Sequence, residues 1–207
     1  MADKVKVVVA SRNKHKIREI KDMLSHLSLD IQAVNEVANL PDVIEDGETF
    51  SANAIKKAVE TARAVGYLTL ADDSGLEVDA LNGQPGVYSA RFAGEPSDDG
   101  KNNQRLLDLL AHIPCEQRTA RFRCVIALAW PNGDTRICSG TCEGMIGFEP
   151  EGDNGFGYDP LFIVPEYNRT FAQLTGSIKN QISHRYRALV QLEKVLAGEF
   201  MKKSVDR

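Results

Sequence analysis

The feature that most constrains the fold is the valine-rich run KVKVVVA at residues 4–10. A short run that is apolar at almost every position is typical of a strand covered on both faces, as in a parallel sheet. A helix is predicted to follow from about Lys14, because apolar residues recur there with helical spacing. These residues are Ile17, Ile20, Leu24 and Leu27. A buried strand followed directly by an amphipathic helix indicates the α/β class.

The alternation of strand and helix continues through the first third of the chain. A second strand is predicted at residues 29–34, and Thr49 can cap a helix that ends at Gly66. The run YLTLA at residues 67–71 predicts the next strand, which leads directly into two adjacent aspartates. The predicted order of elements is therefore β–α–β–α–β.

The middle of the chain has a different pattern. Residues 82–101 carry the glycines and prolines of a long loop, and a helix is predicted at residues 102–110. Apolar and polar residues alternate in RTARFRCVIALAW, residues 118–130, as in a strand with one buried face. The Asn-Gly pair within residues 131–134 favours a hairpin turn, and residues 135–144 form the returning strand. The central sheet is therefore predicted to be mixed, with a long antiparallel hairpin.

Length and composition indicate a soluble globular chain, and residues 1–207 are enough for one large domain or two closely joined lobes; we expect a single domain with two lobes. The 207 residues are 43% hydrophobic and 26% charged, and a final helix is predicted at residues 179–196. The formal net charge of −4 provides no general field for nucleic acid, so we expect no nucleic-acid partner. No apolar run approaches the roughly 18 residues of a membrane-spanning helix, so we expect no membrane partner.

The four cysteines lack the spacing of a zinc site. Cys138 and Cys142 are separated by three residues, but Cys115 and Cys124 form no matching pair, and no histidine cluster completes a ligand set. Reduced thiols in a cytosolic protein are the favoured interpretation. We therefore expect a cytoplasmic location.

The segment SRNKHK lies between the first predicted strand and its helix. Ligands of open α/β sheets bind beyond the carboxyl ends of strands, and the free N–H groups of a helix N-terminus favour phosphate. The segment adds neutral donors and positive charge through Ser11, Arg12, Asn13, Lys14 and Lys16. It is a candidate phosphate site, and the alternative is an ordinary N-capped helix with solvated lysines.

Asp72 and Asp73 follow the third predicted strand. Successive strand residues point to opposite faces, so one carboxylate can hold a cation while the other orients water or a lysine. Magnesium binds through few carboxylates together with substrate phosphates, and Glu45 in the preceding loop is a further candidate ligand. The alternative is a plain turn, which the sequence Asp-Asp-Ser-Gly suits well.

Two later segments are candidates for contact with a nucleotide. In GFGYDP, residues 155–160, the glycines allow close backbone approach, and Phe156 or Tyr158 can stack on a base. The alternative for this segment is a tight turn with a buried phenylalanine. His184 and Arg185 are predicted on the polar side of the last helix, where such residues are usually exposed.

Together these segments resemble one family. SRNKHK, ADDSGLEVDALNGQPGVYSARFAG, GFGYDPLF and SHR, in this order, are similar to the inosine/xanthosine triphosphate pyrophosphatases, which hydrolyse aberrant purine nucleotides. The resemblance covers residues 5–196. One departure is Ser11, where many members carry threonine, and the hydroxyl is kept. The resemblance implies a mixed α/β fold with two lobes that flank a substrate cleft, and a homodimer.

The resemblance also implies a reaction and a set of site residues. A purine nucleoside triphosphate (ITP, dITP or XTP) is cut with Mg²⁺ between the α- and β-phosphates into monophosphate and pyrophosphate. Glu45 and Asp73 are the implied metal ligands, and Asp73 is the implied proton acceptor, with Asp72 and Lys57 as further catalytic residues. The implied substrate-binding residues are Ser11, Arg12, Asn13, Lys14, His15, Lys16, Ser74, Phe156, Gly157, Tyr158, Asp159, Lys179, His184 and Arg185.

The chemistry of this reaction agrees with these roles. Attack at phosphorus needs a positioned water and neutralised charge, and Mg²⁺ supplies the neutralisation. A carboxylate has a low ordinary pKa, so Asp73 is a poor base unless metal and burial help, and we expect activity to rise toward alkaline pH. Arg185 offers only donors, which match the 6-oxygen of hypoxanthine but oppose the amino group of adenine. We predict that Arg185→Ala loses much of the preference for ITP over ATP.

Two other functions stay open. A pyrimidine-directed nucleotide pyrophosphatase of the septum-inhibitor-like group is expected to carry serine and consecutive arginines after the first strand, and SRNKHK fits this less well. A nucleotide-sensing module without activity does not require the acidic pair at residues 72 and 73. Pyrophosphate release from ITP, with and without a chelator, distinguishes the three.

Overall fold

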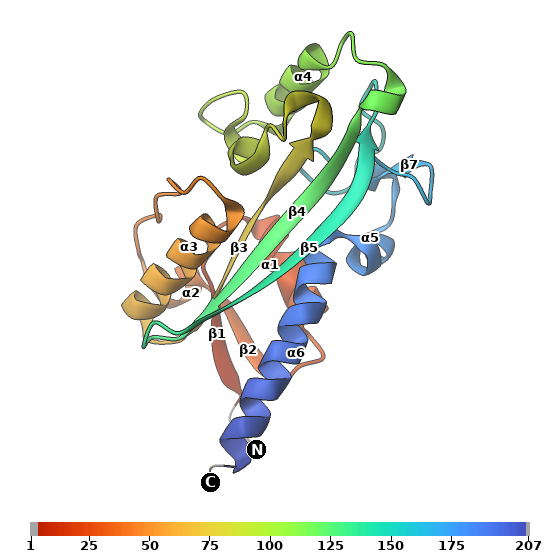
Figure 1. Ribbon diagram of the computed structural model, residues 1–207. Helices are drawn as coiled ribbons and strands as arrows, with labels where there is room; N and C mark the ends of the chain where they lie inside the picture. Colours follow the sequence, from red (N-terminus) through yellow and green to blue (C-terminus); the bar gives the residue numbers. More distant parts are fainter. Residues whose placement is uncertain (1–3, 206–207) are drawn as a thin grey trace. The chain divides into compact units, whose positions relative to one another are not determined.

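The computed structural model describes the backbone of residues 4–205 and the side chains of residues 4–199. Its strands form a seven-stranded sheet in the order β2–β1–β3–β4–β5–β6–β7 (Figure 1). The chain divides into two compact units, each with its own core. Of the described residues, unit 1 comprises 4–73, 124–140 and 185–205, and unit 2 comprises 74–123 and 141–184. The predicted mixed α/β class is confirmed.

Unit 1 confirms the alternating elements predicted for the first third of the chain. β1 (Val5–Val9) lies between β2 (Leu29–Ala33) and β3 (Leu68–Val78), and both pairings are parallel. The helices of this unit are α1 (Lys14–Met23), α2 (Val34–Val37), α3 (Phe50–Val65) and α6 (His184–Val205), whose first residue belongs to unit 2. The short α2 is an addition to the predicted order.

Local sequence explains where these helices begin and end. Asn13 Oδ1 accepts hydrogen bonds from the backbone amides of His15 (3.0 Å) and Lys16 (3.2 Å), so it caps α1. The Thr49 hydroxyl accepts from a first-turn amide of α3 at 3.1 Å. Gly66 ends α3 with a φ of +73°, a left-handed conformation that favours glycine. The predicted cap and stop residues of α3 are therefore confirmed.

The core of unit 1 unites the valine run with the predicted helical stripe. α1 and α6 pack against the face of the sheet that carries Val7 and Val9, and α3 lies on the other side of these strands in Figure 1. The buried members of this core include Val7, Val9, Ile20, Leu24, Leu70, Ile126, Leu128, Leu189, Leu192 and Leu196. The strand β1 is therefore covered on both faces, as its sequence predicts.

Unit 2 holds the rest of the sheet and several short helices. Strands β4 (Thr119–Ala129) and β5 (Thr135–Ile146) contribute residues to both units, as β3 does. The remaining elements are the 3₁₀ helices η1 (Asp79–Leu81), η2 (Gly86–Arg91), η3 (Cys115–Gln117) and η4 (Phe171–Gln173), helices α4 (Asp99–Leu109) and α5 (Gly176–Ile182), and strands β6 (Phe162–Val164) and β7 (Arg169–Thr170). α4 begins three residues earlier than predicted, because Asp98 caps it through Lys101 N (3.0 Å).

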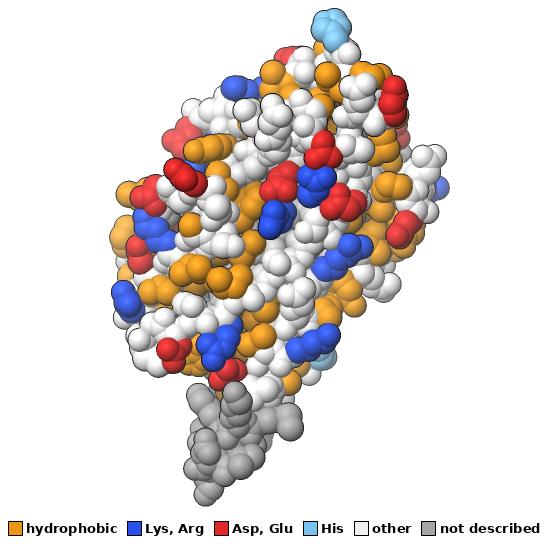
Figure 2. All heavy atoms as spheres, in the orientation of Figure 1, with side chains coloured by type: hydrophobic (Ala, Val, Ile, Leu, Met, Phe, Trp, Pro, Cys, Tyr) orange, Lys and Arg blue, Asp and Glu red, His pale blue; other side chains and the backbone are white. Residues whose placement is uncertain are grey.

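The predicted hairpin turn is confirmed between β4 and β5. Trp130 N donates to Asp134 O at 3.0 Å, and Gly133 has a φ of +97°. On unit 2 the solvent face of the hairpin carries alternating charges, where Arg121 pairs with Asp79 (2.8 Å) and Glu143 (3.1 Å). Figure 2 shows acidic and basic side chains interspersed over this part of the sheet. The polar residues of the alternating pattern therefore face water.

Two sequence predictions about element boundaries are wrong. β3 continues through Val78, so the acidic pair lies inside a strand and not in a turn. The predicted last helix is two helices, α5 and α6, separated at Ser183. Ser183 has extended backbone angles (φ −67°, ψ 159°), which are typical of a residue that starts a new helix.

Some expectations about the whole molecule stay predictions. The lobes around a cleft, the single domain over residues 1–207 and the homodimer are among them. Within the described part of the chain, no helix is both long and apolar enough to cross a membrane.

Candidate active site

The acidic pair lies where β3 extends past the end of β1. The parallel pairing of the two strands ends at Val9 and Leu70, and Ala10 N donates to Leu70 O at 2.8 Å. The segment 11–16 leaves β1 at this point and enters α1. Because parallel strands share an edge at their carboxyl ends, this geometry brings Lys16 to Asp72.

Asp72 is a fully buried carboxylate that is saturated by partners. Lys16 Nζ lies 2.6 Å from Oδ1, and Arg185 Nε donates to Oδ2 at 2.8 Å. The Cys124 thiol donates to Oδ2 at 3.1 Å. Burial by itself would raise the pKa of Asp72, but the charges and hydrogen bonds of Arg185 and Lys16 hold it well below its usual range. Asp72 is therefore an anion fixed between two cations.

Arg185 connects this anion to a second carboxylate. Its Nη1 bonds Glu19 of α1, three residues after Lys16. Burial lowers the pKa of Arg185, but Asp72 and Glu19 outweigh it and raise the pKa, so the guanidinium stays charged. The sequence prediction that Arg185 and His184 are exposed is wrong, because they are only 1% and 4% exposed. His184 and Phe122 both belong to unit 2, and their rings stack with 4.8 Å between centroids.

Asp73, the neighbour of Asp72, has the opposite environment. Its side chain is buried, its nearest cation is Lys57 Nζ at 3.6 Å, and its Oδ2 has no hydrogen-bond partner among the described residues. Burial raises the pKa of Asp73, Lys57 and Lys16 offset part of the rise, and Glu45 adds to it. Asn53 lowers the pKa of Asp73 slightly, although Asn53 Nδ2 makes no hydrogen bond of normal geometry within the described residues. Asp73 is therefore the more basic aspartate of the pair.

Lys57 links Asp73 to the predicted metal ligand Glu45. Its Nζ lies 2.6 Å from Glu45 Oε1 and donates to the backbone oxygen of Asp72 at 2.9 Å. One ammonium group thus lies within 4 Å of both predicted ligand carboxylates.

The donor set fits magnesium. The described side chains contain no group of three or more histidines, cysteines, aspartates and glutamates that could hold a metal. Magnesium needs only one or two carboxylates when phosphates complete its shell, and it prefers hard oxygen donors. Glu45 and the unpartnered oxygen of Asp73 provide such donors.

The loop that carries Glu45 is fixed to α3. Asn53 Oδ1 accepts from Gly47 N at 2.8 Å, and Lys56 Nζ lies 2.7 Å from Asp46 Oδ1. A Cβ at Gly47 would lie 2.7 Å from Asn53 Oδ1, so only glycine fits this close approach. Asn53 was missed by the sequence analysis because an asparagine inside a helix has no distinctive spacing.

The rest of the segment 11–16 surrounds the start of α1. Ser11 Oγ accepts from Asn13 N at 3.2 Å, and Arg12 pairs with Asp42 at 3.1 Å and also bonds Leu40 O. Lys14 and His15 are exposed. The alternative of an N-capped helix is thus correct for the local geometry, and Lys16 is the residue of this segment that reaches the acidic pair.

In unit 2 the predicted base-binding residues form a second cluster, the Phe156 loop (residues 155–159). Asp159 Oδ2 accepts from Phe156 N at 2.9 Å and from Lys179 Nζ at 2.6 Å. The same ammonium lies 4.9 Å from the centroid of the Phe156 ring. Tyr158 is buried, and its hydroxyl donates to Ser89 O at 2.8 Å. Phe156, which is half-buried, is therefore the aromatic residue suited to stacking.

Two further predicted residues need separate mention. Gly155 has a φ of +82°, and a Cβ there would lie 2.0 Å from Asp159 Oδ2, so the turn requires glycine. Ser74 follows Asp73 in β3 and is half-buried.

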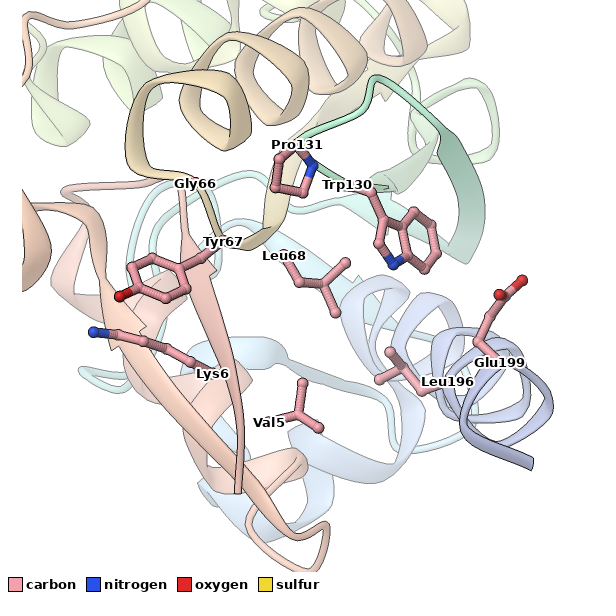
Figure 3. Close-up of a pocket in the computed structure, with 9 residues that line it drawn as sticks. All are labelled: Val5, Lys6, Gly66, Tyr67, Leu68, Trp130, Pro131, Leu196 and Glu199. Carbon is pink, nitrogen blue, oxygen red and sulfur yellow. The ribbon is translucent and has the colours of Figure 1, made fainter. Parts of the chain in front are cut away.

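A pocket elsewhere in unit 1 lacks the features of a catalytic site. It has a volume of about 370 Å³ and lies at the amino-terminal ends of β1 and β3 (Figure 3). Apolar side chains dominate its wall: Val5, Leu68, Trp130, Pro131 and Leu196. Its two charged residues already have partners: Lys6 lies over the ring of Tyr67, which also lines the pocket, and Glu199 bonds Arg136. The acidic pair is therefore the better candidate active site.

Comparisons with known proteins show the family of the chain. The model of the Ham1 family matches residues 7–195. A dITP/XTP pyrophosphatase of Desulforamulus reducens is 52% identical over 201 residues, which cover 97% of this chain and 100% of that protein. The solved structure of the Staphylococcus aureus Ham1 protein has a TM-score of 0.85 and 43% identity, covering 94% of this chain and 99% of that one. A HAM1 protein from Coxiella burnetii has a TM-score of 0.86 and 44% identity, with the same coverage. The chain therefore belongs to the Ham1 family.

Proposed function

We propose that the protein hydrolyses aberrant purine nucleoside triphosphates (ITP, dITP and XTP) to the monophosphate and pyrophosphate, with magnesium. The observation that carries the proposal is the buried Asp73 carboxylate beside Lys57 and Glu45, one oxygen of which has no hydrogen-bond partner among the described residues. The high identity to proteins named dITP/XTP pyrophosphatase supports the reaction and its substrate class.

Glu45 and Asp73 are proposed to hold the metal. When bound there, Mg²⁺ neutralises phosphate oxygens and acidifies a coordinated water. Asp73 has a raised pKa because of its burial, which makes it a better proton acceptor than an exposed aspartate. Lys57 keeps the two carboxylates together before substrate arrives and supplies positive charge to the phosphates afterwards. This assigns the proton transfer to Asp73 and the charge balance to Lys57.

Asp72 is proposed to act without touching the reacting atoms. Its depressed pKa and its bonds to Lys16 and Arg185 leave it with little basicity. It therefore holds Lys16 in place beside Ser11 and Asn13, the proposed triphosphate-binding residues. The role of Arg185 in base selection stays a proposal, and its contacts with Asp72 and Glu19 give it a structural role in addition.

The Phe156 loop is proposed to bind the purine base. Phe156 supplies a ring for stacking, and Lys179 lies against that ring. Stacking alone accepts any base, so discrimination against adenine needs hydrogen bonds to the edge of the base as well. The homodimer and the cytoplasmic location are proposals of the same kind.

A nucleotide panel tests the proposed function directly. Wild-type protein is incubated with ITP, dITP, XTP, GTP and ATP in magnesium buffer, and the products are identified by ³¹P NMR. We expect monophosphate and pyrophosphate from the first three substrates, and loss of turnover when EDTA removes the metal. Release of orthophosphate with diphosphate, or equal turnover of ATP and ITP, would reject the proposal.

A further inference from the structure

We propose that Asp99 and Asn103 of α4 are positioning residues for the purine base, because they hold the backbone of Gly157 and thereby set the place of Phe156. The inference rests on the proposed stacking role of Phe156. It concerns two residues that lie outside the recognised motifs of the chain and that were not predicted to belong to the site. We call the pair the α4 clasp.

The clasp grips both polar groups of one peptide residue. Gly157 N donates to Asp99 Oδ2 at 2.7 Å, and Asn103 Nδ2 donates to Gly157 O at 3.0 Å. Asp99 and Asn103 are four residues apart in α4, so they project from the same side of the helix. The bond to Asp99 is charge-assisted, which makes it stronger than a bond between neutral groups. Gly157 is thus fixed on its donor and its acceptor by a single rigid element.

Hydrogen bonds within the Phe156 loop connect Gly157 to the backbone that carries the Phe156 ring. Phe156 N donates to Asp159 Oδ2, and Asp159 N donates back to Phe156 O at 3.3 Å, so residues 156–159 form a closed turn. Tyr158 is anchored separately through Ser89. The Phe156 ring therefore belongs to a turn whose Gly157 peptide groups are bonded to α4.

Neither Asp99 nor Asn103 is the N-cap of α4. The N-cap of α4 is Asp98, whose carboxylate accepts from Lys101 N, so Asp99 is not needed as a cap. Asn103 is 92% buried, and its Oδ1 has no hydrogen-bond partner among the described residues. Burial of an amide with only one of its two polar groups bonded is unfavourable. The hydrogen bond from Asn103 Nδ2 to Gly157 O is the interaction that offsets this cost.

The test compares changes in the clasp with a matched change beside it. Asp99→Ala removes the acceptor, and Asn103→Asp places a carboxylate oxygen opposite Gly157 O with almost no change in shape. Asp98→Asn is the control, because it removes one negative charge from the same helix end and keeps a good N-cap residue. Phe156→Ala gives the effect of losing the stacking ring outright, and thermal unfolding shows whether each variant is folded.

The measured quantities are KM and kcat for ITP, and the inhibition constants of IMP and inorganic tripolyphosphate. For both variants we expect KM and the inhibition constant of IMP to rise about tenfold. Asp99→Ala removes a hydrogen bond to a charged group, and Asn103→Asp replaces a donor with an acceptor that repels Gly157 O. We expect kcat and the inhibition constant of tripolyphosphate to stay within about twofold, since tripolyphosphate has no base. Asp98→Asn should match the wild type in all four.

Two results would overturn the inference. One is an unchanged KM and IMP constant in folded clasp variants, and the other is an equal rise for IMP and tripolyphosphate, which indicates general damage. Failure of the proposed function is a separate result, because it would appear in the wild type as the absence of IMP and pyrophosphate. In that event calorimetric binding of IMP to the same variants still decides whether the clasp positions a base.

Discussion

Asp72 and Asp73 are adjacent in one strand, yet their surroundings are opposite. Asp72 lies against Lys16, Arg185 and Cys124 and has a strongly lowered pKa. Asp73 lies 3.6 Å from Lys57 Nζ and has a raised pKa, and one of its oxygens has no hydrogen-bond partner within the described part of the chain. Because successive residues of a strand point to opposite faces, two identical side chains can meet two different environments.

The comparison shows how a strand separates structural from chemical charge. The Asp72 anion is stabilised by the fold and in turn neutralises the buried Arg185 and the half-buried Lys16, so its reactivity is low. The Asp73 anion is disfavoured by burial and only partly compensated, so it keeps affinity for a proton or a metal ion. The same comparison predicts which aspartate matters for activity and which for stability.

The largest expected effect is the loss of activity when Asp73 is replaced. Asp73→Asn should lower kcat for ITP by about 10²- to 10⁴-fold, as for loss of a general base. Because the folded-state pKa of Asp73 is raised, its charged form opposes folding at neutral pH, so removal of the charge should leave the free energy of unfolding equal or higher. Steady-state kinetics and urea unfolding at pH 7 measure the two effects. A variant that unfolds more easily at pH 7 would contradict the sign.

The next effect breaks the Asp72 side. Asp72→Ala leaves the buried Arg185 and the half-buried Lys16 without their shared anion, which should lower the free energy of unfolding by about 3–5 kcal/mol. The control is Asp42→Ala, which removes an exposed partner of Arg12 and should cost less than about 1 kcal/mol. Urea unfolding of both variants measures the difference. Equal losses would show that the buried ion pairs of Asp72 contribute no more to stability than the exposed ion pair of Asp42 and Arg12.

A smaller effect is a separation of the acid limits of activity and stability. As the pH is lowered, activity should fall before stability does. The pKa of Asp73 is raised, so this carboxylate takes up a proton at a higher pH than an ordinary aspartate. The stability from Asp72 has the opposite sign: it is present above the unfolded-state pKa and is lost only as the pH falls toward the lowered folded-state pKa. A pH–rate profile beside urea midpoints over the same range tests this order. Coincident losses would indicate that unfolding alone limits activity.

The sequence predicted the elements whose signals are local. The valine run at residues 4–10, the Thr49 cap, the Gly66 stop and the Asn-Gly turn each depend on neighbouring residues, and all four were confirmed. Lys16 and the acidic pair were each predicted to follow a strand, and the structure brings Lys16 to Asp72 because parallel strands share a carboxyl edge.

What the sequence could not show are contacts between distant residues. Arg185 bonds Glu19 across 166 positions and Asp72 across 113, so its amphipathic pattern suggested a surface residue while the fold buries it. Cys124 and Asn103 have no motif that marks them, and their roles follow from the partners that the fold provides. Glu19 had one usable signal, its position one turn after Lys16 on α1.

The most direct test of the division between the two aspartates is magnesium binding. Isothermal calorimetry would follow Mg²⁺ binding to the wild type, Asp72→Asn and Asp73→Asn in the presence of α,β-methylene-ITP, which resists cleavage. We predict that Asp73→Asn loses most of the Mg²⁺ affinity, while folded Asp72→Asn keeps affinity within a few-fold of the wild type. Loss of Mg²⁺ binding in Asp72→Asn with full binding in Asp73→Asn would contradict the account.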